Sequence, residues 1–239
     1  MPISQYLEHP GIQIAAGRVL KTSSIHKFGA VPSMAVNTNG TIWDVSDTLY
    51  PWSAFDTPNV LTVLPVNAAD NGHYITVLGL DADYNPIEET FTLSSTATVT
   101  GTKVFKRVYR AYYYNTIKNV GQINVQCNGT TVLRITAGKA QTLMAIYTVP
   151  AGKTGYLLKG TASIQYGGDA TIDMFVHYFG QQSFRIGHTA EVAGTGMPYT
   201  YEFGVPIRIP EKSDLDIRAT TRSNNARVTA AFDIILVDN

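Results

Sequence analysis

The sequence predicts an all-β protein made of two antiparallel β-sandwich (jelly-roll-like) domains preceded by an extended N-terminal arm. Two observations favour this fold class. Charged residues make up only 15% of the 239 residues, and 28 threonines help to fill the difference from the usual quarter. Short runs rich in Val, Ile, Thr and Tyr recur along the chain, and Asn-Gly turn signals separate several of them.

The chain divides into three predicted parts. Residues 1–30 scatter a few large apolar side chains among Gly, Ser and Ala, so we expect an arm that docks on a neighbouring subunit. A disordered tail, or a strand of the chain's own sandwich, is the alternative. Strand-like runs then predict a first sandwich over 31–117 and a second over 118–239. Because no Pro- or Ser-rich linker marks the division near 115–121, a single larger sandwich also stays open.

Period-two alternation identifies which side chains should face the core. The run at 170–180 places one apolar set on a single face: Ile172, Met174, Val176 and Tyr178. The run "SDLDIRAT" points Leu215, Ile217 and Ala219 inward. Its other face is expected to be a solvated edge that carries Asp214, Asp216, Arg218 and Thr220.

Charge and composition restrict the classes of partner. The net charge is zero and the pI is about 7.0, so no field of one sign favours nucleic acid or an anionic membrane, and we expect neither partner. No stretch approaches 18 apolar residues, and the start shows no basic segment followed by an apolar one. The lone Cys127 cannot form an internal disulfide. These features predict a soluble chain made in a cytoplasm.

The run "YTVPAGKTG" contains the Gly-Lys-Thr that ends a phosphate-binding loop. Such a loop needs a Gly five positions before Gly152, where this chain has Tyr147. It also needs a helix to follow, whereas strand-forming residues follow here. We therefore predict a hairpin turn at Pro150–Lys153 and no nucleotide site.

The run "DADYNPIEE" places oxygen ligands at alternate positions, Asp81, Asp83 and Asn85, as a calcium loop does. The Gly that should come next is Pro86, and the Glu of the twelfth position is Thr92. A hairpin apex explains the run better, because Asp and Asn hydrogen-bond their own backbone in turns. An ion at this place stays open.

The acidic residues do not pair in a catalytic pattern. Glu88 and Glu89 are adjacent on a predicted strand and point to opposite faces. Asp173 and His177 share a face but lie roughly 13 Å apart on an extended strand. We expect no catalytic residue, cofactor site or metal site, and therefore no enzyme activity.

The run "KVFKRVYRAYYYN" interleaves four basic residues with aromatic ones. It predicts a long strand whose rings pack across to neighbouring strands, with a subunit interface or the stacking of bases or sugars as alternatives. Both tryptophans fall in "TIWDVSDTLYPW", where they cap the first sandwich or anchor the arm on a neighbour. The candidate interface residues are Trp43, Trp52, Tyr109, Arg110, Tyr112, Tyr113 and Tyr114.

Several runs in a fixed order carry a resemblance to a known type of protein. They are "SIHKFGAVPSM", "GTIWDVSDTLYPW", "ITVLGLDADYNPIEETFTLSSTATVTGTKVFKRVYRAYY", "NVGQINV" and "QTLMAIYTVPAGKTGYL". Over about residues 25–160 the chain resembles a virion structural protein of tailed bacteriophages, of the marine phage and cyanophage type. Residues 160–239 match it only in general β character.

The resemblance implies a non-enzymatic virion component that is assembled in the host bacterial cytoplasm. Without coiled-coil heptads or fibre repeats, a capsid decoration (cement) role fits best. The expected partners are then the major capsid protein or other virion proteins, and further copies of the chain in a homo-oligomer. A tail, collar or fibre-associated adaptor, or a receptor-binding protein, is the alternative. A carbohydrate-active enzyme fits less well, because repeats and paired acids are missing.

Overall fold

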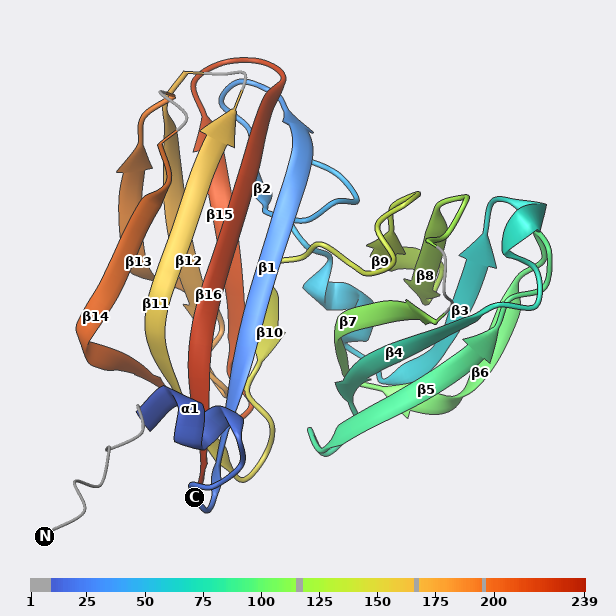
Figure 1. Cartoon of the computed structure of the whole chain (residues 1–239), viewed down its shortest axis with the longest axis horizontal. Helices are drawn as coiled ribbons and strands as arrows, with labels where there is room; N and C mark the ends of the chain where they lie inside the picture. Colours follow the sequence, from blue (N-terminus) through green and yellow to red (C-terminus); the bar gives the residue numbers. More distant parts are fainter. Residues whose placement is uncertain (1–9, 115–117, 166–167, 195–196) are drawn as a thin grey trace, which may run out of the picture.

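The computed structural model describes residues 10–114, 118–165, 168–194 and 197–239, and the fold class is all-β as predicted (Figure 1). Nearly all regular structure is antiparallel strand, and one α-helix, α1 (Pro10–Ala15), occurs among the described residues. Two β-sandwiches of unequal size lie side by side (Figure 1).

The larger sandwich has eight main strands in two facing sheets. The first sheet has the order β1 (Thr22–Met34), β16 (Ala226–Asp238), β11 (Lys153–Gln165), β14 (Tyr199–Ile209). The second has the order β10 (Ile146–Thr148), β15 (Asp214–Thr221), β12 (Ala170–His177), β13 (Arg185–Val192), and the short β2 (Asn39–Thr41) also pairs with β15. Apart from β12 and β13, which pair as neighbours in the second sheet, the successive main strands alternate between the sheets, in the double Greek-key pattern of a jelly roll. We call this unit the jelly-roll domain.

The smaller sandwich is inserted into the jelly roll between β2 and β10, and we call residues 43–144 the inserted domain. One sheet has the order β6 (Val99–Phe105), β3 (Asn59–Pro65), β8 (Ile123–Cys127), β9 (Thr130–Ile135). The other has the order β5 (Pro86–Thr92), β4 (Tyr74–Leu80), β7 (Arg107–Tyr114). Two 3-10 turns, η1 (Trp52–Phe55) and η2 (Ala68–Asp70), precede β3 and β4.

The predicted domain boundaries, 31–117 and 118–239, are wrong. Strands β8 and β9 belong to the inserted domain, and β2 belongs to the jelly roll. The chain crosses between the domains twice, at Ile42–Trp43 and Met144–Ala145. Both crossings are hydrogen-bonded like strands, with Ala145 N–H donating to the Ile42 carbonyl at 2.9 Å. Because the crossing segments are themselves strand-like, no change in composition marks the two crossings in the sequence. The predicted division at 115–121 falls inside the inserted domain, and its residues 115–117 lie outside the described residues.

The predicted arm over residues 1–30 is also wrong for its second half. Residues 22–30 lie in β1, which pairs antiparallel with β16 along its length. The small residues that suggested a loose arm reflect tight packing instead. A Cβ on Gly29 would lie 2.2 Å from the Ile42 carbonyl oxygen, so only glycine fits where the crossing segments pass over β1. Residues 1–9 of the predicted arm lie outside the described residues.

Helix α1 lies against the outer face of the first sheet, at the lower end of the jelly roll in Figure 1. Gly11 and Ile14 face Leu158 of β11 and Ile235 of β16. The chain is therefore held to its own domain from Pro10 onward.

Both motifs that were predicted to be turns are turns. The segment before Lys153 joins β10 to β11, with Gly152 at φ 71°, but these strands lie in different sheets, so it is not a hairpin. Asp81 Oδ1 accepts hydrogen bonds from the backbone N–H groups of Asp83 and Asn85, both at 2.9 Å. The side chain of Asp81 thus stabilises the β4–β5 hairpin apex.

Candidate interaction surfaces

Three of the predicted interface residues lie where the inserted domain meets the jelly roll. The Tyr109 ring packs edge-on against Tyr147, with 5.1 Å between ring centroids. The Arg110 guanidinium lies 5.8 Å from the Phe28 ring and donates to the His26 carbonyl. Trp52 packs against Phe184 with centroids 5.7 Å apart. The aromatic and basic strand therefore forms an interface within one chain.

The other predicted interface residues are divided between core and surface. Trp43 and Tyr113 are 2% and 6% exposed in the core of the inserted domain, so neither can contact a neighbouring subunit. Tyr112 is half-buried, and its hydroxyl accepts a hydrogen bond from Arg110 at 2.9 Å. Tyr114 is 63% exposed and is free to contact another molecule.

Asp214 is buried at the domain junction, so its predicted solvated position is wrong. The Arg107 guanidinium of the inserted domain forms two 2.9 Å hydrogen bonds with its carboxylate. The hydroxyl of Thr148 donates to it at 2.6 Å, and His177 Nδ1 lies 3.6 Å away. A bidentate, buried Arg–carboxylate pair thus joins the two domains.

Asp216 is buried beside it, and its predicted exposure is wrong for the same reason. The Trp52 indole N–H of the inserted domain donates to this carboxylate at 3.2 Å. Thr41 and Arg218, both from the jelly roll, donate at 2.8 and 2.9 Å. Alternation correctly placed both aspartates on the outer face of the sheet, but the inserted domain covers that face.

The junction shifts the ionisation of the groups in it. Burial would raise the pKa of Asp214, but hydrogen bonds from His177, Arg107 and Thr148 outweigh burial and hold the pKa below its usual value. The hydrogen bond to Asp214 raises the pKa of His177. For Asp216 burial prevails over Arg218 and the other donors, and its pKa is raised.

Lys27 is a further buried charge that the sequence did not single out. Its side chain is 2% exposed and points from β1 toward the inserted domain, where Nζ donates to the Tyr109 carbonyl. Burial, and secondarily the charge of Arg110, lower its pKa well below the usual value. Lys27, Arg107 and Trp52 therefore hold the two domains together by polar contacts.

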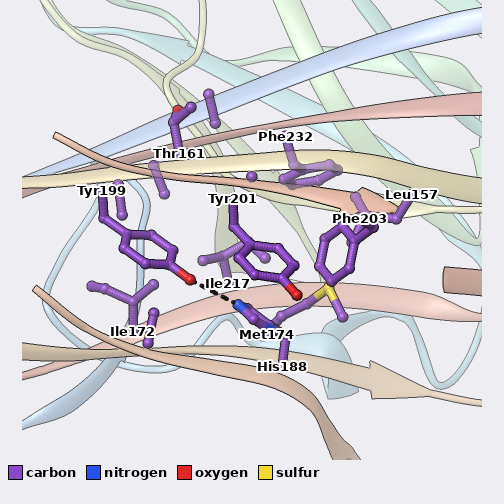
Figure 2. A pocket seen from close by; sticks show the side chains of 15 residues that line it. Leu157, Thr161, Ile172, Met174, His188, Tyr199, Tyr201, Phe203, Ile217 and Phe232 are labelled. Carbon is purple, nitrogen blue, oxygen red and sulfur yellow. Dashed lines mark hydrogen bonds between the residues drawn. The ribbon is translucent and has the colours of Figure 1, made fainter. Parts of the chain in front are cut away.

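A second candidate surface is an aromatic slot at the edge of the jelly roll (Figure 2). Tyr199, Tyr201 and Phe203 alternate along β14 and point between the sheets, toward His188 of β13. The Tyr199 hydroxyl lies 3.3 Å from His188 Nε2, and the His188 and Tyr201 rings are 4.7 Å apart. The floor is apolar: Leu157, Ile172, Met174, Ile217 and Phe232.

The space within the aromatic slot is small. The cavity measures about 50 Å³, which suits the end of one aliphatic side chain. Small-molecule sites usually measure several hundred Å³. The slot is therefore a better match for a protruding side chain of another polypeptide than for a free ligand.

The slot lies between two strands that each end a sheet. Strand β14 pairs only with β11, and β13 pairs only with β12, among the residues described. Large apolar side chains are exposed along this side: Ile186 at 56%, Met197 at 73%, Tyr201 at 42% and Val205 at 85%. We call the side formed by β13, β14 and these residues the open edge. The run "YTYEFG", with aromatic residues at every second position, was the sequence signal that could have identified it.

The described parts of the chain contain neither a group of side chains that could hold a metal ion nor a membrane-spanning helix. No three His, Cys, Asp or Glu side chains there are grouped to hold a metal ion. No helix there is long and apolar enough to cross a membrane.

No protein-family model and no curated protein matches this chain. Among solved structures, infectious bursal disease virus of the Gt strain matches at 10% identity and a TM-score of 0.23, over 91% of this chain and 73% of that chain. The Gx strain matches at 10% identity and a TM-score of 0.24, over 91% and 73%. The VP2 subviral particle of the same virus matches at 10% identity and a TM-score of 0.22, over 92% and 72%. Similarity at this level supports no conclusion about function.

Proposed function

We propose that this chain is a non-enzymatic structural component of a tailed-bacteriophage virion, and that it decorates the capsid by binding the major capsid protein. The observation that carries the proposal is the double Greek-key jelly roll with an inserted sandwich, in a chain whose residues 25–160 resemble such a component. A jelly roll by itself serves many functions, so the support comes from fold and resemblance together.

The distribution of polar groups is consistent with a structural role. The buried ionisable side chains Lys27, Arg107, Asp214 and Asp216 are used to fix one domain on the other. The apolar side chains of the open edge remain exposed, and exposed apolar patches favour protein contacts. Two domains joined by buried polar contacts, with such an edge, suit a repeated subunit that binds other virion proteins.

Cryo-electron microscopy of purified particles of the phage that encodes this chain tests the proposal. We expect copies in the hundreds, bound on the outside of the head lattice. Six, twelve or eighteen copies at one vertex or on the tail would contradict the decoration role and support the adaptor or receptor-binding alternative. Absence of the protein from purified particles, checked by mass spectrometry, would overturn the virion role altogether.

A binding assay with purified components tests the decoration role against the alternatives and does not require native phage particles. Empty heads built from the major capsid protein alone should bind the purified chain and co-sediment with it. A control variant, Leu20→Asp, changes a residue that is 87% exposed outside the open edge and should bind equally. Failure of the unaltered chain to co-sediment would count against the decoration role.

A further inference from the structure

We propose that the open edge and its aromatic slot accept residues 1–9 of a second copy of this chain as an added β-strand. The proposal rests on the proposed role as a repeated subunit, and it names the partner of a surface to which no role has been given. Its tests use purified protein alone, so their failure is distinguishable from failure of the virion role.

The open edge offers both requirements for strand addition. Main-chain groups of β14 that face away from β11 are available to pair, because β14 ends its sheet in the part of the chain that the structure describes. The slot beside it receives one apolar side chain from the added strand, between Tyr201 and Met174. In this recognition mode the backbone hydrogen bonds provide affinity and the pocket provides specificity.

The segment that precedes α1 offers aliphatic side chains for the slot. Residues 1–9 read MPISQYLEH, in which Ile3 and Leu7 would share one face of an extended strand with Gln5, and Ser4 and Glu8 would share the other with Tyr6. Leu7 or Ile3 matches the slot, and Ser4 and Glu8 would lie toward the outer face of the sheet, where Glu202 is exposed. The segment is short and has few charges, so little desolvation opposes its docking.

The length of the segment favours docking in the slot of a second copy over docking in the slot of its own chain. Pro10 begins α1, which lies on the outer face of the first sheet over Leu158. To reach its own slot, the segment must pass over β14 and around the sheet edge. That path takes about 15–20 Å, from strand and sheet spacings of about 5 and 10 Å. Nine residues span about 30 Å, so roughly three or four would remain for pairing, fewer than a usual strand of about five. The segment of a second copy can use all nine.

A disulfide experiment between two single-cysteine chains tests the assignment. Leu7→Cys on one chain and Val205→Cys on the other are mixed under mild oxidation, and the native thiol does not compete because Cys127 is buried. We expect a mixed disulfide dimer, because Val205 is exposed on β14, two residues beyond Phe203, which lines the slot. Leu20→Cys, equally exposed at 87% against 85%, replaces Val205→Cys as the matched control and should give only background. Equal yields with both acceptors would overturn the proposal.

Placing both substitutions in one chain distinguishes the two sources of the segment. We expect linked multimers on a non-reducing gel, with the yield rising with protein concentration. A monomer with an internal disulfide at every concentration would show that the segment fills its own slot, and would overturn docking on a second copy.

A peptide titration tests strand addition directly and does not alter the folded protein. The synthetic peptide of residues 1–9 is titrated into the protein that lacks those residues. Replacing Leu7 by Asp should weaken binding about tenfold or more, because one buried aliphatic side chain is lost. Ser4→Asp, on the other face, is the matched control and should change binding little. N-methylation of alternate peptide nitrogens should abolish binding, because it removes the strand hydrogen bonds. Undetectable binding of the unmodified peptide, or equal binding of the Leu7→Asp and Ser4→Asp peptides, would contradict the proposal.

Discussion

At the scale of single residues, buried carboxyl groups give this protein a pH dependence that its zero net charge conceals. Asp44 is 7% exposed in the inserted domain, and its carboxylate accepts a 2.8 Å hydrogen bond from Thr136. Burial raises the pKa of Asp44 to about 6, despite that hydrogen bond and the nearby Arg134. The folded protein therefore binds this proton more tightly than the unfolded chain, and Asp44 lowers stability as the pH rises from about 4 to about 6.

Replacing Asp44 by Asn removes this contribution while the oxygen that accepts from Thr136 is kept. Two pKa units correspond to about 3 kcal/mol, so the stability of Asp44→Asn relative to the native protein should improve by about that amount between pH 4 and pH 7. Urea unfolding at the two pH values measures the difference. The exposed Asp56→Asn serves as a control. A relative stability that does not change with pH would contradict the prediction.

Arg107 and Asp214 provide a second test at this scale. Arg107→Met leaves a buried carboxylate without its bidentate partner, which should cost about 3–5 kcal/mol of unfolding free energy. Combining it with Asp214→Asn removes the unpaired charge, so the double variant should lose less than the sum of the two single variants. A double-mutant cycle measured by urea unfolding gives the coupling. Strictly additive losses would show that the pair does not hold the domains together.

At the scale of elements, β1 depends on a residue that carries no side chain. Gly29 faces the two crossing segments, and a Cβ there would lie 2.2 Å from the Ile42 carbonyl and 2.4 Å from Ala145 N. Gly29→Ala should therefore destabilise the protein by about 3 kcal/mol or more, as severe overpacking does. Gly160→Ala on β11 is the matched control, since nothing lies within 4 Å of its Cβ, and should be neutral or slightly stabilising. The melting temperatures of the two variants, measured by thermal unfolding, test this prediction. Similar melting temperatures for Gly29→Ala and Gly160→Ala would contradict it.

The same elements show how far the sequence could predict the fold. Alternation correctly placed Leu215 and Ile217 in the core, because that depends only on neighbours along the strand. Exposure of Asp214 and Asp216 depends on a domain that crosses the outer face from elsewhere in the chain, and no local pattern contains that information. The arm prediction was wrong over residues 22–30 for the same reason, since β1 pairs with a strand about 200 residues later. The hairpin apex at Asp81 was predicted correctly because its chemistry is local, whereas at Gly152 the turn was predicted but not the change of sheet that it makes.

The surfaces were predicted less well than the fold. Aromatic and basic residues in β7 indicated an interface, but composition does not tell an interface between domains from one between subunits. The slot was missed because its aromatic residues were interpreted as ordinary strand alternation. What distinguishes it is that β14 ends its sheet, which is a property of the topology.

At the scale of the whole molecule, the two domains should unfold together. Two hydrogen-bonded crossings and the buried contacts of Lys27, Arg107 and Trp52 connect the sandwiches, so neither can lose its structure without exposing charges of the other. Differential scanning calorimetry should give one transition with equal calorimetric and van't Hoff enthalpies. Two separate transitions in the unaltered protein would contradict this, whereas Arg107→Met should broaden or divide the transition.

The pairing of β1 with β16 affects how the chain folds as it leaves the ribosome. The first strand of the jelly roll emerges early, but its partner begins at Ala226, and at about 5–20 residues per second it follows after roughly 10–40 s. During that interval residues 43–144 are complete and can fold, while β1 waits with its apolar face unpaired. The inserted domain thus separates the nascent β1 from later strands, and synthesis of the thirteen residues of β16 completes the sheet in which β1 and β16 pair.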